Sequence, residues 1–309
     1  MRGAARRLPA LAAFLLLAAC GYGYDYGVHQ TSVTIPPVDG VRITSMTVFS
    51  GRFPPCPEEG KDLHDRTYPV IEPADERRIS AAYEVTNADT EAFTYTIRFA
   101  FIADPRDGVR NEENLSQVEA SEEETVRAVG PGVTVRGTVR QGMIAHAYCP
   151  VTRVRVTGVT RVPTTEAPPG PDECPPGGLR LTVDGRDGSM GLRQLGLRLE
   201  NCGTRDHALD GYPLLELLDT DRARLDGVQI RHGSGGVWGM GPGFFDEPAR
   251  PLVLAPGESA YAGLAWRMDS TDIPYLRVRA QQGAAPVTLT PHLDLGATGT
   301  LAVSPWTRR

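Results

Sequence analysis

Residues 94–101 read Thr-Tyr-Thr-Ile-Arg-Phe-Ala-Phe, and bulky apolar side chains occupy every second position. Tyr95, Ile97, Phe99 and Phe101 therefore share one face of an extended chain, because successive side chains of a strand point to opposite faces. The other face carries Thr94, Thr96, Arg98 and Ala100. This alternation predicts a strand with one buried and one solvated face, and it favours an all-β fold.

The same period of two recurs on both sides of this stretch. The shorter alternating runs are Ala81, Tyr83 and Val85, then Val133 and Val135 behind Pro131-Gly132, and finally Val154 and Val156. Asn87 and Asp89 predict a turn, since both side chains bond to nearby backbone. Several short strands at this spacing predict an immunoglobulin-like β-sandwich domain over residues 41–163. The acidic stretch 107–124 interrupts them and is predicted to be a mobile surface loop.

A second domain is predicted after a proline-rich linker at residues 164–173, which has no apolar period and an extended preference. Alternation returns over residues 174–309, with Pro256-Gly257 opening a strand through Tyr261. Leu276 and Val278 can pair with Val287 and Leu289 across Gly283. The further alternating residues are Leu179, Leu181, Val183, Leu195, Leu197, Leu199 and Leu214 to Leu218. The chain is thus predicted to hold two tandem immunoglobulin-like β-sandwich domains.

The two halves share one order of short motifs. A strand ends in asparagine at Asn87 and at Asn201, and a Pro-Gly turn later opens another strand at 131–132 and at 256–257. Turn chemistry alone can produce such a parallel, so it gives only weak support for two related folds.

The first 19 residues predict a signal peptide that ends before a lipidated cysteine. Arg2, Arg6 and Arg7 form a positive region, and the apolar stretch 8–19 is too short to span a bilayer. Cys20 directly follows Ala18-Ala19, so we expect it to carry diacylglycerol and an amide-linked fatty acid such as palmitate. Residues 20–40 would form a flexible tether. The alternatives are cleavage by ordinary signal peptidase, which leaves a bare thiol, and twin-arginine export.

Lipidation predicts an extracytoplasmic protein anchored to the outer face of the cytoplasmic membrane. The four other cysteines, Cys56, Cys149, Cys174 and Cys202, allow three disulfide pairings. Pairing Cys56 with Cys149 and Cys174 with Cys202 is the choice that does not tie the two halves together. An oxidising compartment favours disulfides, and free buried thiols are the alternative.

Composition argues against one class of partner. The formal net charge is −6, and no basic stripe interrupts the distribution of charge. Nucleic acid is therefore not an expected partner. The chain has one lysine, Lys61, among its 32 basic residues, which is typical of a GC-rich genome.

Four motifs of the second half resemble a known family. They are Cys174-Pro175-Pro176, Leu199-Glu200-Asn201-Cys202-Gly203, Gly211-Tyr212-Pro213 and Leu254-Ala255-Pro256-Gly257. In this order they are similar to the actinobacterial secreted domain-of-unknown-function family 4232, over residues 174 to about 306. The resemblance implies an exported or lipid-anchored protein from a Streptomyces-like actinobacterium. The first half resembles only the general immunoglobulin-like modules of such lipoproteins.

No catalytic motif emerges, so we expect no enzyme, no catalytic residue and no cofactor beyond the lipid. The glycine-rich run at 233–239 lacks the order of a dinucleotide cradle, and no Gly-x-Ser-x-Gly is present. We also expect no metal site. Three sets contain ligand types but too few of them, namely Asp62 with His64 and Asp65, Asp269 with Asp272, and His232 with Met240.

One loop is a candidate for ligand contact. His232, Trp238, Phe244 and Phe245 lie on a glycine-rich segment that can expose aromatic faces to a sugar or a protein. The alternative is that these rings close the end of a core. We therefore expect a non-enzymatic binding or envelope-organising module whose partner is an envelope protein or glycan. A metal-binding or enzymatic accessory protein using the 232–245 loop is the competing interpretation, and a first domain that is merely a spacer is a third.

Overall fold

The computed structural model describes residues 26–33, 35–51, 79–103, 117–141, 151, 153–237, 240, 243–296 and 299–308. The described chain is nearly all strand, and its single helical element is the short 3-10 helix η2 at Phe244–Asp246. The predicted all-β class is confirmed. Among these residues we find no helix with the length and apolar character needed to cross a membrane.

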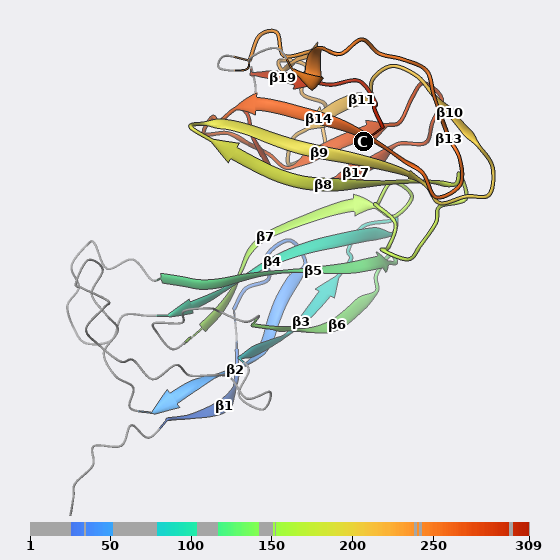
Figure 1. Ribbon diagram of the computed structural model, residues 1–309. Coiled ribbons are helices and arrows are strands. Elements are labelled where there is room, and N and C mark those ends of the chain that lie inside the picture. The colour runs from blue at the N-terminus through green and yellow to red at the C-terminus, as the bar shows by residue number, and fades with distance from the viewer. Residues whose placement is uncertain are drawn as a thin grey trace, which may run out of the picture.

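Two sheets pack face to face in the N-terminal unit, residues 26–163 (Figure 1). The first has the order β1-β2-β3-β6, with β1 at Tyr26–Ser32, β2 at Val41–Gly51, β3 at Ser80–Thr86 and β6 at Thr134–Arg140. The second has the order β5-β4-β7, with β5 at Gln117–Val129, β4 at Phe93–Ala103 and β7 at Arg153–Pro163. All pairings in both sheets are antiparallel.

The core of this unit lies between the two sheets. Tyr95, Ile97, Phe99 and Phe101 of β4 are all fully buried, as their alternation predicts. They pack in one cluster with Ala81, Tyr83 and Val85 of β3 and with residues of β2, β5, β6 and β7. The polar positions of β4 are left on the outer face of the β5-β4-β7 sheet.

The C-terminal unit, residues 174–308, is built around a five-stranded sheet with the order β12-β19-β14-β9-β8. Its strands are β8 at Leu179–Ser189, β9 at Leu192–Asn201, β12 at Gln229–His232, β14 at Ser259–Arg267 and β19 at Thr300–Val303. A sheet of order β11-β16-β17 comprises Leu214–Leu218, Tyr275–Arg279 and Val287–Leu289. Two separate two-stranded sheets complete the described part of this unit. They pair β10 (His207–Leu209) with β13 (Leu252–Leu254) and β15 (Asp272–Ile273) with β18 (Leu293–Asp294).

A second buried cluster fills this unit, and it takes residues from both larger sheets. Trp266 and Trp306 are its largest members, and both are about 1% exposed. Each indole N–H is bonded, Trp266 to the Asp294 carboxylate and Trp306 to the Ala280 carbonyl. Among the described residues, a large core therefore lies on each side of the 164–173 segment. The domain boundaries and the immunoglobulin-like assignment of each unit stay predictions.

The predicted hairpin near the end of the chain is confirmed in register. Leu276 lies opposite Leu289 and Val278 opposite Val287, and Gly283 in the turn has a φ of +81°. That conformation favours glycine, since it has no Cβ to clash with the backbone.

Two segments differ from their predictions. Residues 26–32, predicted as part of a flexible tether, form β1 and pair with β2 along their whole length. Residues 117–124, predicted as loop, belong to β5 and pair with β4. Both are polar edge strands, which are held by backbone hydrogen bonds, so hydrophobic periodicity does not reveal them.

The parallel between the halves is a shared hydrogen-bond arrangement, which we call the asparagine lock. In the N-terminal unit, the buried Asn87 amide donates to the carbonyls of Glu91 (2.7 Å) and Val129 (2.8 Å), and its oxygen accepts from the Asp89 N–H. The Gly132 N–H, in the Pro-Gly turn, donates to the Asn87 carbonyl at 2.8 Å.

The C-terminal unit repeats this lock bond for bond. The buried Asn201 amide donates to the carbonyls of Arg205 (2.8 Å) and Leu254 (2.7 Å), and its oxygen accepts from the Gly203 N–H. The Gly257 N–H donates to the Asn201 carbonyl at 2.7 Å. In both units one buried asparagine joins the end of a strand to the turn that opens another.

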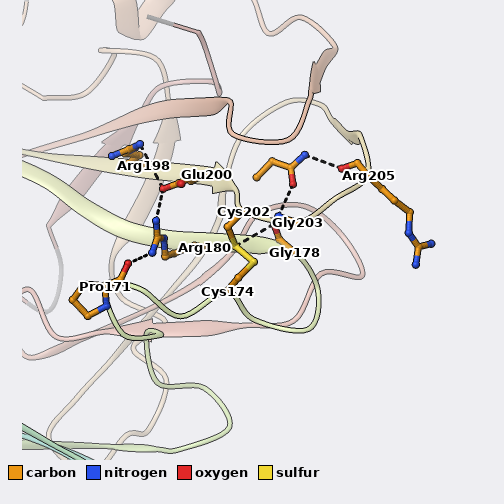
Figure 2. Close-up of a disulfide and its surroundings, with 10 residues drawn as sticks. Pro171, Cys174, Gly178, Arg180, Arg198, Glu200, Cys202, Gly203 and Arg205 are labelled. Atoms are coloured by element: carbon orange, nitrogen blue, oxygen red, sulfur yellow. Dashed lines mark hydrogen bonds and ion pairs between the residues drawn. A yellow bond between two sulfur atoms is a disulfide. The ribbon is translucent and has the colours of Figure 1, made fainter.

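A disulfide lies beside the second lock. Figure 2 shows the disulfide bond between Cys174 and Cys202. Their Cα atoms are 5.7 Å apart. This confirms the predicted pairing of these two residues. Cys56 and Cys149, the other predicted pair, lie outside the described residues.

Candidate functional site

The two units touch through the outer face of the β5-β4-β7 sheet, the polar face that the alternation in β4 predicts to be solvated. On one side of this contact, Val162 and Ala167 pack against Leu218 and Tyr275 of the C-terminal unit. The Tyr275 hydroxyl accepts a hydrogen bond from the Arg161 N–H at 3.1 Å. This side of the contact is closed and apolar.

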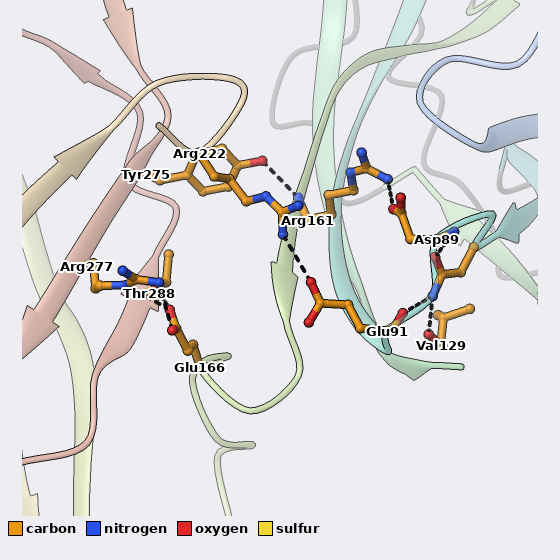
Figure 3. Close-up of polar contacts among 10 residues, drawn as sticks. Asp89, Glu91, Val129, Arg161, Glu166, Arg222, Tyr275, Arg277 and Thr288 are labelled. Atoms are coloured by element: carbon orange, nitrogen blue, oxygen red, sulfur yellow. Dashed lines mark hydrogen bonds and ion pairs between the residues drawn. The ribbon is translucent and has the colours of Figure 1, made fainter. Parts of the chain in front are cut away.

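Arg222 extends the closed side (Figure 3). Its guanidinium lies 4.6 Å from the centre of the Phe93 ring and 4.0 Å from the Glu91 carboxylate. An arginine over an aromatic face is attracted by the negative charge of the ring face. Arg222 therefore joins the C-terminal unit to the residues that follow the Asn87 lock.

The proline-rich segment is anchored to the C-terminal unit by Glu166. Its carboxylate accepts two hydrogen bonds from the Arg277 guanidinium, at 2.9 and 2.8 Å, and one from the Thr288 hydroxyl at 2.8 Å. Arg127 of β5 donates to the Pro168 carbonyl at 2.6 Å. Fixed bonds at these points make the segment a spacer that holds the two units in place.

On the other side of the contact the units separate and leave a cleft of about 450 Å³. Residues of both units and of the 164–173 segment line it: Thr94, Thr96, Arg98, Glu123, Thr125, Arg127, Val162, Pro168, Thr182, Val183, Arg186, Leu289, Thr290, Pro291 and His292. This volume lies within the usual range for small-molecule sites. We call it the inter-unit cleft.

Arg98 crosses from β4 to the C-terminal unit at one end of the cleft. Its register partner on β7 is Gly158, where an added Cβ would lie 2.9 Å from Arg98 Nη2. Glycine therefore gives the guanidinium room to lie across the strand. Arg98 Nη2 is 3.3 Å from His292 Nδ1. His292 Nδ1 is in turn 2.7 Å from the Asp272 carboxylate.

A β-bulge in β8 shapes the opposite wall. The register of β8 with β9 shifts between Val183 and Arg186, and Gly185 inside the bulge has a φ of +79°. A Cβ at Gly196, on β9, would overlap the Asp184 carbonyl oxygen, so glycine is required there as well. Bulges re-aim side chains, and this one leaves both Val183 and Arg186 lining the cleft.

The predicted ligand-contact loop is partly a core element. Phe245 is 3% exposed and packs with Val237, Ala265 and Ala302 on the face of the five-stranded sheet away from the main core. Phe244 is 44% exposed, and its ring lies over Gly263 of β14. Phe245 is therefore a buried packing residue and does not expose an aromatic face. Trp238 lies outside the described residues.

Asp246 closes this loop on itself, and His232 lies beside it. The Asp246 carboxylate accepts from the Ser234 N–H at 2.9 Å and hydroxyl at 2.6 Å, and these bonds lower its pKa. His232 is exposed and stacks on Tyr212, with ring centres 3.7 Å apart. His232 thus lies on the strand before the loop, while Phe245 packs against one face of the five-stranded sheet.

The remaining predicted sites divide by location. Cys20, Cys56, Cys149 and the Asp62, His64 and Asp65 set lie outside the described residues. Asp272 pairs with His292 at the cleft, while Asp269 accepts from the Ser270 N–H. Within the described ranges, no three His, Cys, Asp or Glu side chains gather as a metal-binding group.

Sequence reasoning did not identify the cleft residues. Thr94, Thr96 and Arg98 carried a signal, since they are the polar half of the alternating strand, but the pattern assigns that face to water. The cleft depends on how two units pack, and Arg186 depends on a bulge that disrupts alternation.

Comparison with known families identifies one domain. Residues 174–307 match the family described as Domain of unknown function (DUF4232). No curated protein and no solved structure matched the chain. The motifs behind the resemblance have structural roles here: Asn201 and the 254–257 turn form the lock, Cys202 forms the disulfide, and the Gly211 carbonyl accepts from the backbone N–H of Trp306.

Proposed function

We propose that this chain is a lipid-anchored extracytoplasmic protein that acts as a non-enzymatic binding module, with the inter-unit cleft as its binding site. The cleft is the observation that carries this proposal. It lies where two units meet, which is a preferred location for ligand sites, and both units contribute polar side chains to it.

Two features support the extracytoplasmic location. The leader and Cys20 have the pattern of lipoprotein processing. The Cys174–Cys202 bond fits an oxidising compartment, where disulfides persist. Each buried acyl methylene contributes about 0.8 kcal/mol, so two or three chains on Cys20 would hold the protein at the membrane.

Filling the cleft tests the binding role. Thr182→Trp places an indole in the cleft, and Thr138→Trp places the same ring on β6, an edge strand outside it. Both full-length variants are compared with the unmodified chain for photo-cross-linking to envelope components in intact cells. We expect Thr182→Trp to abolish a cross-link that Thr138→Trp retains. Equal cross-linking by both variants would contradict a role for the cleft.

Location is tested separately with Cys20. Cys20→Ser removes the acceptor sulfur, and we expect the protein to move from the membrane fraction to the soluble extracytoplasmic fraction. Retention of the variant in the membrane after a high-salt wash would contradict lipid anchoring.

A further inference from the structure

The inter-unit cleft is a cationic patch on an acidic protein. The chain has a formal net charge of −6, yet the ionisable groups lining the cleft are Arg98, Arg127, Arg186, His292 and one acid, Glu123, with Asp272 beside the cleft as the partner of His292. Arg98 lies opposite Glu123 in the β4–β5 register, but its guanidinium reaches over Gly158 toward His292 instead. The positive charge is therefore directed into the space between the units.

The guanidinium N–H donors of Arg186 have no partner among the described residues. Its side chain is exposed, and its guanidinium makes no hydrogen bond or ion pair with any described residue. The bulge and its two glycines, Gly185 and Gly196, place it in the wall of the cleft rather than along an ordinary strand face. Arg98 lines the same cleft from the other unit and makes one Nη2 contact with His292, which leaves further N–H donors.

The rest of the lining narrows the chemistry of a ligand. Hydroxyl groups come from Thr94, Thr96, Thr125, Thr182 and Thr290, and a hydroxyl can both donate and accept a hydrogen bond. No Phe, Tyr or Trp is among the described lining residues, so the cleft lacks the large aromatic faces that stack on a neutral sugar or a flat heterocycle. Guanidinium groups match carboxylate and phosphate geometry with paired N–H donors.

We infer that the inter-unit cleft binds a small, hydroxyl-rich anion, a sugar acid or a sugar phosphate, through Arg186 of one unit and Arg98 of the other. This inference rests on the proposed function, because it assigns a ligand class to the same cleft. The shared chemistry is an anionic group on a hydroxylated body. Carboxylate and phosphate are its two sources, and the test separates them.

Isothermal titration of the full mature chain at low salt tests the inference with three probes: glucuronate, glucose 6-phosphate and neutral glucose. We expect at least one of the two anions to bind at least tenfold more tightly than glucose, and its affinity to fall as salt screens the charges. The better anion identifies which acid the arginines select.

Substitutions then locate the bound anion. Arg186→Gln and Arg98→Gln should each weaken binding at least tenfold, because each removes a charge-assisted hydrogen bond. Arg250→Gln is the matched control, since Arg250 is exposed, outside the cleft, and changes the net charge equally; we expect an affinity within twofold of the unmodified chain. Far-ultraviolet circular dichroism confirms that each variant is folded.

Three results would overturn the inference. They are the absence of binding by both anions at 10 mM, equal weakening by Arg250→Gln and Arg186→Gln, and glucose binding as tight as that of the anions. The proposed function fails independently, if Thr182→Trp leaves envelope cross-linking intact. Loss of that cross-link without anion binding would retain the binding site and reject only the ligand class.

Discussion

The two units close their cores with the same asparagine lock but secure the loop behind it differently. In the C-terminal unit, Cys202 directly follows Asn201 and ties that loop covalently to Cys174. In the N-terminal unit, Asp89 behind Asn87 pairs with Arg161, and Glu91 contacts Arg222 of the other unit. The comparison indicates that the lock is the common element, whereas a disulfide and an inter-unit contact are exchangeable ways to support it.

Removing the disulfide should have the largest effect and should be confined to one unit. Cys174→Ser with Cys202→Ser opens a loop with a sequence separation of 28 residues. The chain-entropy model then predicts a loss of about 3.5 kcal/mol from the C-terminal unit. Tryptophan fluorescence during urea unfolding measures this, because Trp238, Trp266 and Trp306 all lie in the second half of the sequence. An unchanged fluorescence midpoint would show that the lock alone secures this loop.

Removing each lock in turn should destabilise the two units separately. Asn201→Ala and Asn87→Ala each leave two backbone carbonyls and one N–H without their partner, at a cost of about 3 kcal/mol. We expect Asn201→Ala to shift the fluorescence transition, and Asn87→Ala to shift mainly the part of the circular dichroism transition that fluorescence does not follow.

Asparagine to aspartate is the matched control for both positions. Asp keeps the shape and the acceptor but cannot donate when ionised. We expect Asn87→Asp and Asn201→Asp to lose stability at pH 7 to an extent similar to alanine. Full stability of either aspartate variant at pH 7 would contradict the role of the amide donors.

The spacer contact should have an intermediate effect on the coupling of the units. Glu166→Ala removes three hydrogen bonds from a half-buried carboxylate, and we expect a loss of about 1.5 kcal/mol. The unfolding transitions of the two units, followed by calorimetry, should move apart. Asp172→Ala, an exposed change in the same segment, should leave them in place. Identical calorimetric profiles for the two variants would show that Glu166 does not couple the units.

The smallest expected effect is a gain in the stability of the N-terminal unit when Glu124 is replaced. Burial raises the pKa of the Glu124 carboxyl, and the nearby Glu122 adds to the rise. A group whose pKa is higher in the folded state favours folding when protonated, so its unfavourable effect develops as the pH rises through that raised pKa. Glu124→Gln should therefore add on the order of 0.5 kcal/mol at pH 7, after screening by solvent, and nothing at acid pH.

Glu123→Gln is the control for this gain, since Glu123 is exposed on the opposite face of β5. We expect it to leave the urea midpoint at pH 7 unchanged. A gain from Glu124→Gln that is as large at acid pH as at pH 7 would contradict the titration of this carboxyl.

The sequence predicts the fold where hydrophobic period is strong. The buried face of β4 and the β16–β17 register follow directly from alternation, because one face of each strand packs on a core. Hydrophobic periodicity does not predict the edge strands β1 and β5, since polar strands are held by backbone hydrogen bonds. Pairing of Cys174 with Cys202 was predictable from the division into halves.

The cleft could not be predicted in the same way. Its residues come from β4, β5, β7, the 164–173 segment, β8, β17 and the residues after β17, which meet only when two units pack together. Arg186 owes its position to a bulge, and Arg98 to the missing side chain of Gly158. Conversely, Phe245 looked like a contact residue because it lies in a glycine-rich loop, yet it covers a sheet.

Native-state hydrogen exchange measured by mass spectrometry tests the shared lock most directly. For Asn87→Ala we predict faster exchange in β3 and β6 with unchanged protection of β9 and β14, and for Asn201→Ala the reverse pattern. If either substitution raised exchange equally in both units, or in neither, the claim that each core is closed by its own asparagine would be contradicted.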